Sequence, residues 1–215
     1  VLAGSTGALF RLAMAAGDTF GLDPVNVRHA HSHLMYFGWA TPALFALIAR
    51  RLPALGGREV PHVRRVIGAT FALALLSFPS FLLFGYGPAE VGGARLPLSV
   101  IASALNVLAW YAFAAVYLRA RRDAPPSPAL RVLDLAVLFL VLSTMGAWGL
   151  PVVVATDGSD ALKAALTHLF LDAFSEGWFV LGVLGLAAVQ ARVTDARGRV
   201  LRIASWAVAA GVPFV

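Results

Sequence analysis

The sequence predicts an all-α integral membrane protein, a polytopic bundle of about seven transmembrane helices whose N-terminal side faces the cytoplasm. Three observations predict this. Of the residues, 60% are hydrophobic and only 13% are charged, whereas soluble domains carry about 25% charged residues. The apolar runs are long enough to cross a hydrocarbon core of roughly 30 Å. The connections between these runs alternate between arginine-rich and arginine-poor. The lipid bilayer is therefore the expected solvent of this chain.

The apolar runs predict the helices in chain order. Residues 1–16 form the tail of a first helix, and residues 203–215 the start of a seventh. Between them the sequence predicts five spanning helices at 29–49, 66–86, 97–118, 132–155 and 163–190. Ser127-Pro128 is a typical helix start, because serine caps the first turn and proline suits its geometry. We expect one transmembrane domain over residues 1–215, incomplete at both ends.

The basic residues predict the orientation of the helices. Of the 17 Lys and Arg, 13 lie in three segments that each separate two apolar runs, within residues 50–65, 119–131 and 192–202. The alternate connections are arginine-poor and contain most of the acidic residues between helices. Short basic loops stay on the cytoplasmic side of a membrane. The net charge of +6 therefore indicates a multi-pass protein of the inner (cytoplasmic) membrane, and we expect no nucleic-acid partner.

A histidine triplet opens the second predicted helix, at the outer face of the membrane. On a helix, His29 and His33 share a face, while His31 points about 200° away from His29. The three cannot bind one metal together from a regular helix. Either the pair binds copper or zinc, or a single histidine reaches a heme iron. The alternative is a helix end whose histidines meet only water and lipid headgroups.

A second cluster lies on the sixth predicted helix, where His168, Asp172 and Glu176 recur every four residues. A charged side chain near the bilayer centre costs roughly 2.5–3.5 kcal/mol, so we expect the stripe to face the bundle interior. There it forms a metal site, a proton path or a structural polar network. On the first helix, Arg11 pairs with a heme propionate or with Asp18, or extends to the interface.

Two segments resemble the large subunit of the heme-copper oxidases and nitric oxide reductases. The first runs from Gly7 through Arg11 to His31-x-x-x-Met35-x-Phe37-Gly38, within residues 7–50, and the second covers residues 165–180. The resemblance implies that His31 is an axial ligand of a low-spin heme b, with His29 and His33 as neighbouring or alternative ligands. Glu176-Gly177 matches the reductase branch, but Asp172 stands where that family has a metal-binding histidine.

The resemblance implies a heme-binding redox protein of respiratory electron transport, and an oxidoreductase if it is an enzyme. The implied second centre holds copper or non-heme iron, with His168 as a ligand and with Asp172 and Glu176 as catalytic groups. Its implied partners are a cytochrome or quinol electron donor and other respiratory subunits. Two alternatives stay open. One is a proton-coupled transporter of metal ions or small solutes, and the other is a non-catalytic subunit or assembly factor.

Overall fold

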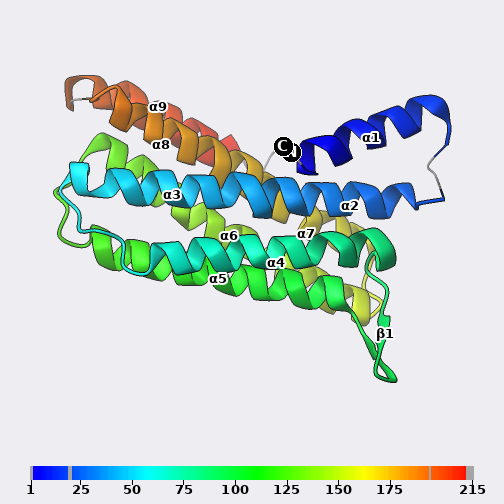
Figure 1. Ribbon diagram of the computed structural model, residues 1–215. Coiled ribbons are helices and arrows are strands. Elements are labelled where there is room, and N and C mark those ends of the chain that lie inside the picture. The colour runs from blue at the N-terminus through cyan, green and yellow to red at the C-terminus, as the bar shows by residue number, and fades with distance from the viewer. Residues whose placement is uncertain (1, 19–20, 194, 212–215) are drawn as a thin grey trace. The chain divides into compact units, whose positions relative to one another are not determined.

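The computed structural model describes residues 2–18, 21–193 and 195–211, which are helical over most of their length (Figure 1). The predicted all-α membrane architecture is confirmed. The elements in chain order are α1 Leu2–Ala16, α2 Pro24–Met35, a π-helical segment Tyr36–Ala40, α3 Thr41–Arg51, a 3-10 turn Leu52–Leu55, α4 Val63–Phe84, β1 Ala89–Val91, β2 Ala94–Leu96, α5 Leu98–Arg121, α6 Pro128–Ala155, α7 Asp160–Asp172, a second π-helical segment Ala173–Val180, α8 Leu181–Gln190 and α9 Asp195–Gly211.

Five helical stretches are long and apolar enough to cross a membrane, by length and composition. They cover Pro24–Leu55, Val63–Phe84, Leu98–Arg121, Pro128–Ala155 and Asp160–Gln190, and they coincide with the five predicted runs. The last helix begins at Asp195, although the apolar pattern predicts a start at residue 203. Arginine is a good helix former, so the helix extends through a basic segment that hydropathy excludes.

Local signals in the sequence explain several helix ends. Ser127 accepts a hydrogen bond from the backbone N–H of Leu130 at 3.2 Å, which confirms the predicted start of α6. Between α4 and α5 the chain forms a β-hairpin that the sequence analysis did not predict (Figure 1). Gly92 and Gly93 both have positive φ, as a two-residue type I′ hairpin turn requires. Glu90 pairs in register with Arg95 across the two strands.

The described chain forms two compact units. The first comprises residues of 1–43 and 64–109, and in it α1 packs against α2 (Figure 1). Gly38 allows α4 to come close, because a Cβ there would lie 3.1 Å from the Cβ of Ala74. The fully buried Asn106 on α5 donates from Nδ2 to the carbonyl of Thr70 on α4, at 3.1 Å. Small residues and interhelical hydrogen bonds thus join these helices, as is typical of membrane proteins.

The second unit comprises residues of 44–63 and 110–215. Its aromatic core contains Phe45 and Phe113, whose stacked rings lie 3.7 Å apart between centroids, and Trp178, whose ring lies 5.6 Å from that of Phe45. Helix α6 packs against α7, the second π-helical segment, α8 and α9. Gly146 on α6 faces the Leu166 carbonyl and Phe170 directly, so any side chain at that position would collide with α7.

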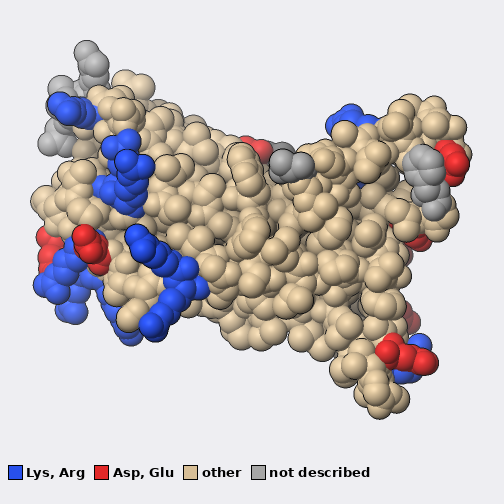
Figure 2. Space-filling view, in the orientation of Figure 1, with Lys and Arg blue, Asp and Glu red and all other residues tan. Residues whose placement is uncertain are grey.

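The arginine-rich segments of the second unit lie together at one of its ends (Figure 2). Arg51, at the end of α3, donates to the side chain of Gln190, at the end of α8, at 2.8 Å. Arg121, at the end of α5, pairs with Asp134 near the start of α6, and Asp134 also accepts from the hydroxyl of Tyr117 at 2.9 Å. The convergence agrees with the positive-inside rule. Assignment of this end to the cytoplasm stays a prediction.

The carboxylate of Asp134 is expected to stabilise the second unit, because it compensates Arg121 and accepts the Tyr117 hydroxyl. Replacing Asp134 by Asn should lower the free energy of unfolding by about 1.5–3 kcal/mol. Asp123→Asn is the matched control. It removes an ion pair with Arg58 whose side chains are 75% and 52% exposed, and such pairs contribute about 0–1 kcal/mol. Denaturation in detergent measures the loss of unfolding free energy in each of the two variants. Equal losses in the two variants would contradict the prediction.

Candidate functional site

The start of α2 determines how the histidine triplet is presented. The Asp23 carboxylate accepts hydrogen bonds from the backbone N–H groups of Val25 at 2.7 Å and Asn26 at 3.2 Å. Pro24 occupies the first helical position, where its fixed φ suits the first turn. These two residues fix where the helix begins. They therefore fix the directions in which the histidines point.

The triplet is divided between two faces of α2, as the helical spacing predicts. His29 and His33 both contact the ring of Phe81 on α4. His31 instead contacts α1, through Ala3 and Gly7. The prediction that His31 points away from the other two is therefore confirmed.

The imidazole of His31 is half-buried and held by α1. Its Nδ1 lies 3.0 Å from the backbone carbonyl of Ala3. A carbonyl oxygen only accepts hydrogen bonds, so Nδ1 donates and carries the ring hydrogen. In the neutral ring, Nε2 then keeps its lone pair. A Cβ at Gly7 would lie 2.6 Å from Cε1 and 3.1 Å from Nε2 of His31, so the glycine lets α1 pack closely against this edge of the ring without a clash.

His33 and His29 belong to an aromatic cluster on the opposite face. The His33 ring stacks on Phe81 at 4.1 Å between centroids and meets the edge of Phe37 at 4.5 Å. Its Nδ1 lies 3.4 Å from the hydroxyl oxygen of Ser103 on α5. The His29 ring lies 5.0 Å from Tyr86 in an edge-on arrangement. The four-residue spacing predicts that these two histidines share a face. It does not predict which residues of α4 and α5 they contact.

Each candidate cluster lies next to, or overlaps, a π-helical segment. The first, Tyr36–Ala40, follows the triplet on the same span, and the backbone N–H of Thr41 donates to the Tyr36 carbonyl. The second, Ala173–Val180, follows Asp172 and contains Glu176. A π-helical turn changes the phase of the residues after it, and such turns are frequent at functional sites. Each of the two segments contains a Gly-Trp pair.

The polar stripe of the second unit runs from an exposed to a half-buried environment. The Nδ1 atom of His168 lies 3.6 Å from the carboxylate of Asp172, and their side chains are 66% and 18% exposed. Glu176 is half-buried. Beside it, the backbone of Gly177 packs closely against the side chain of Phe139 on α6. Asp172 and Glu176 thus turn partly towards their unit, as predicted, whereas His168 does not.

The predicted site residues belong to different units. The triplet and the exposed Arg11 lie in the first unit, and His168, Asp172 and Glu176 lie in the second. Among the described residues, no group of three or more His, Asp and Glu side chains is arranged to hold a metal ion. That finding concerns sites built from several protein ligands. Binding of a heme iron by His31, as one of its axial ligands, stays a prediction.

The comparisons with known proteins give no identification. No protein-family model, curated protein or solved structure matches the chain.

One half-buried carboxylate of the second unit, that of Asp134, was not predicted from the sequence. Asp134 lies within the predicted span 132–155 and is bound by Tyr117 and Arg121. A carboxylate inside an apolar run was the available signal, because such a group requires a partner. Its role follows from the structure: it neutralises the arginine at the end of α5.

The contact between Gly7 and His31 is testable without any assumption about a cofactor. We expect Gly7→Ala to lower the free energy of unfolding by about 1–3 kcal/mol, because the new methyl group overlaps the imidazole. Gly4→Ala is the matched control on the same helix, since nothing lies within 4 Å of a Cβ there. This control should be neutral or stabilising by about 0.5–1 kcal/mol. Thermal denaturation in detergent compares the two. If Gly4→Ala lowered the free energy of unfolding as much as Gly7→Ala, the close contact between Gly7 and His31 would be contradicted.

Proposed function

We propose that this protein is a heme-binding redox protein of the respiratory membrane, in which His31 is an axial ligand of a b-type heme. The observation that carries the proposal is the state of the His31 ring. Its Nδ1 is engaged by the Ala3 carbonyl, and its Nε2 edge lies beside a glycine. Metal-binding histidines commonly donate the other ring N–H to a carbonyl or carboxylate, which fixes both the tautomer and the ring orientation.

The residues around His31 fit such a group. A side chain at position 7 would crowd the nitrogen that binds iron, and Gly7 avoids this. Asp23 and Pro24 fix the start of α2, and with it the direction in which the His31 side chain points. His33 is a weaker candidate ligand, because its ring is stacked on Phe81 and its Nδ1 faces Ser103. His29 lies in the same cluster, against Tyr86.

A bound heme would accept and donate single electrons, with a potential set by its ligands and surroundings. His31 would orient the heme, and apolar side chains of the chain would shield the heme from water. In this proposal Arg11 offers a positive charge to a propionate. Asp172 and Glu176 hold or pass protons, because ionisable side chains inside apolar membrane helices commonly belong to proton pathways.

The acidic stripe also decides which second metal the proposal favours. Asp172 supplies a hard oxygen ligand, which suits iron better than copper(I). A second centre that includes His168 and Asp172 would therefore hold non-heme iron in preference to copper. A membrane-bound quinol or a cytochrome is the chemistry expected of an electron donor to such a protein.

The test is the absorbance of the full-length protein purified after heme-replete expression. We expect a reduced-minus-oxidised spectrum with sharp low-spin b-type bands, and His31→Ala should abolish them because the iron loses one of its two axial ligands. Added imidazole should restore low-spin bands to His31→Ala by occupying the vacated ligand position. Gly7→Ala should shift or weaken the bands, since its methyl group crowds Nε2.

His62→Asn is the matched control for this experiment. His62 is an exposed loop histidine with a φ of 56°, and asparagine tolerates that conformation. The His62→Asn variant should show the same heme bands as the unmodified protein. Absence of heme from the folded, full-length protein would overturn the proposal. Equal loss in His31→Ala and His62→Asn would overturn the assignment of the ligand.

The acidic stripe gives a separate prediction. If Asp172 passes protons during turnover, Asp172→Asn should slow electron transfer coupled to proton uptake by about tenfold or more while leaving the heme bands unchanged. Stopped-flow reduction with a pH indicator measures both signals in one sample. Heme-free protein that takes up metal ions, with uptake abolished by Asp172→Asn, would instead identify a transporter.

A further inference from the structure

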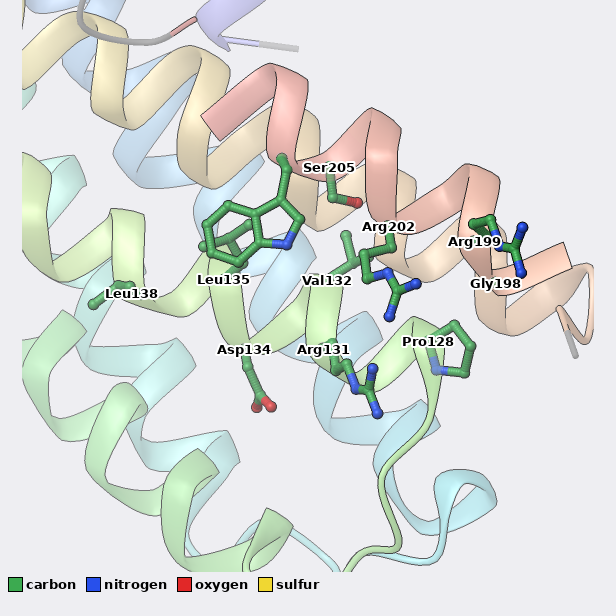
Figure 3. Close-up of a pocket in the computed structure, with 11 residues that line it drawn as sticks. Pro128, Arg131, Val132, Asp134, Leu135, Leu138, Gly198, Arg199, Arg202 and Ser205 are labelled. Atoms are coloured by element: carbon green, nitrogen blue, oxygen red, sulfur yellow. The ribbon is translucent and has the colours of Figure 1, made fainter. Parts of the chain in front are cut away.

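A groove of about 690 Å³ lies between α6 and α9 in the second unit (Figure 3). Its α6 wall includes Pro128, Arg131, Val132 and Leu135, which share one helical face. From α9 it is lined by Gly198, Arg199, Arg202, Ser205 and Trp206. Gly198 allows the two helices to meet at one end, because a Cβ there would lie 2.5 Å from Cγ of Pro128. The groove is thus defined by the packing of two helices.

The charge of the groove is positive. Three arginines line it, Arg131 from α6 and Arg199 and Arg202 from α9 (Figure 3). All three are exposed, and none forms an ion pair with an acidic side chain of the described residues. Asp134 also lines the groove, but its carboxylate is already engaged by Arg121 and by the Tyr117 hydroxyl. The arginines are therefore left without a counter-charge from the described side chains.

Beyond the arginines, the groove becomes apolar along α6. Leu135 and Leu138 line it, and Leu138 is 49% exposed. Trp206 from α9 is 62% exposed, and exposed tryptophans of membrane proteins concentrate at the level of the headgroups. The groove therefore combines a cationic end, an interfacial aromatic side chain and an apolar wall on a membrane span.

We propose that this groove binds an anionic phospholipid, with the headgroup phosphate at Arg131 and Arg202 and an acyl chain along Leu135 and Leu138. Guanidinium groups bind phosphate oxygens through paired hydrogen bonds, and basic pockets between membrane helices bind acidic headgroups. A soluble phosphate compound would satisfy the arginines but would leave the apolar wall and Trp206 uncovered. The amphipathic lipid matches both ends. This site is independent of the heme proposal.

The experiment counts lipids bound to the full-length protein by native mass spectrometry, with titration of phosphatidylglycerol or phosphatidylcholine into detergent. We expect phosphatidylglycerol to bind more tightly than phosphatidylcholine. Arg131→Gln/Arg202→Gln should weaken phosphatidylglycerol binding by about tenfold or more, because two phosphate partners are lost. The matched control is Arg50→Gln/Arg119→Gln, which removes the same charge from exposed arginines of the same unit that do not line the groove.

A second measurement uses the unmodified arginines, so it does not depend on the folding of the double variant. Phosphatidylglycerol with brominated acyl chains should quench the tryptophan fluorescence of the protein, and Trp206→Phe should remove a saturable part of that quenching. Brominated phosphatidylcholine should lack the saturable part. The presence of this component supports the site, and its absence overturns it.

Two competition experiments distinguish a phospholipid headgroup from a soluble phosphate compound as the ligand. Inorganic phosphate and glycerophosphoglycerol, which lacks acyl chains, should displace little phosphatidylglycerol. Full displacement by either compound at comparable concentration would overturn the lipid assignment and identify a soluble phosphate ligand. Equal losses in the groove variant and the control variant would also overturn the proposal, because binding would then follow net charge alone.

Discussion

Polar groups in this chain have to find partners inside an apolar environment, and the rest of the structure depends on this constraint. An unpaired polar group in hydrocarbon costs several kcal/mol, by order of magnitude. Asp134 therefore lies against Arg121 and Tyr117. Asn106 reaches the Thr70 carbonyl on the neighbouring helix. His31 follows the same rule, because its Nδ1 donates to a carbonyl of α1. Each of these bonds also fixes how two helices pack.

The same constraint gives the histidines of α2 different chemistry. The Asp23 cap sets the phase of the helix, and that phase turns His31 towards α1 and the other two histidines towards α4. Against α1, the ring meets a carbonyl that engages Nδ1 and a glycine that lies beside Nε2. Against α4, the rings meet aromatic faces and the Ser103 hydroxyl. One triplet thus provides a candidate ligand on one face and an aromatic packing cluster on the other.

Glycine and the π-helical segments control how closely the helices approach. Gly38, in the first π-helical segment, brings Ala74 of α4 within contact, and Gly177, in the second, brings the ring of Phe139 against the backbone. A π-helical turn leaves the regular hydrogen-bond ladder and shifts the face that follows it. The first segment begins three residues after His33, and the second follows Asp172 and contains Glu176. The irregular backbone therefore lies where the proposed chemistry is located.

The sequence by itself determined the membrane fold class, the five apolar spans, the cap at Ser127 and the separation of His31 from its two neighbours. These features depend on local composition and on the fixed period of a helix, which any single stretch of chain carries. The tertiary structure alone decided the partners of each histidine, the ion pair of Asp134, the π-helical segments and the groove between α6 and α9. Those features depend on which surfaces meet after the helices pack. Contacts between residues as distant as Ala3 and His31, or Pro128 and Gly198, have no periodic signature in the sequence.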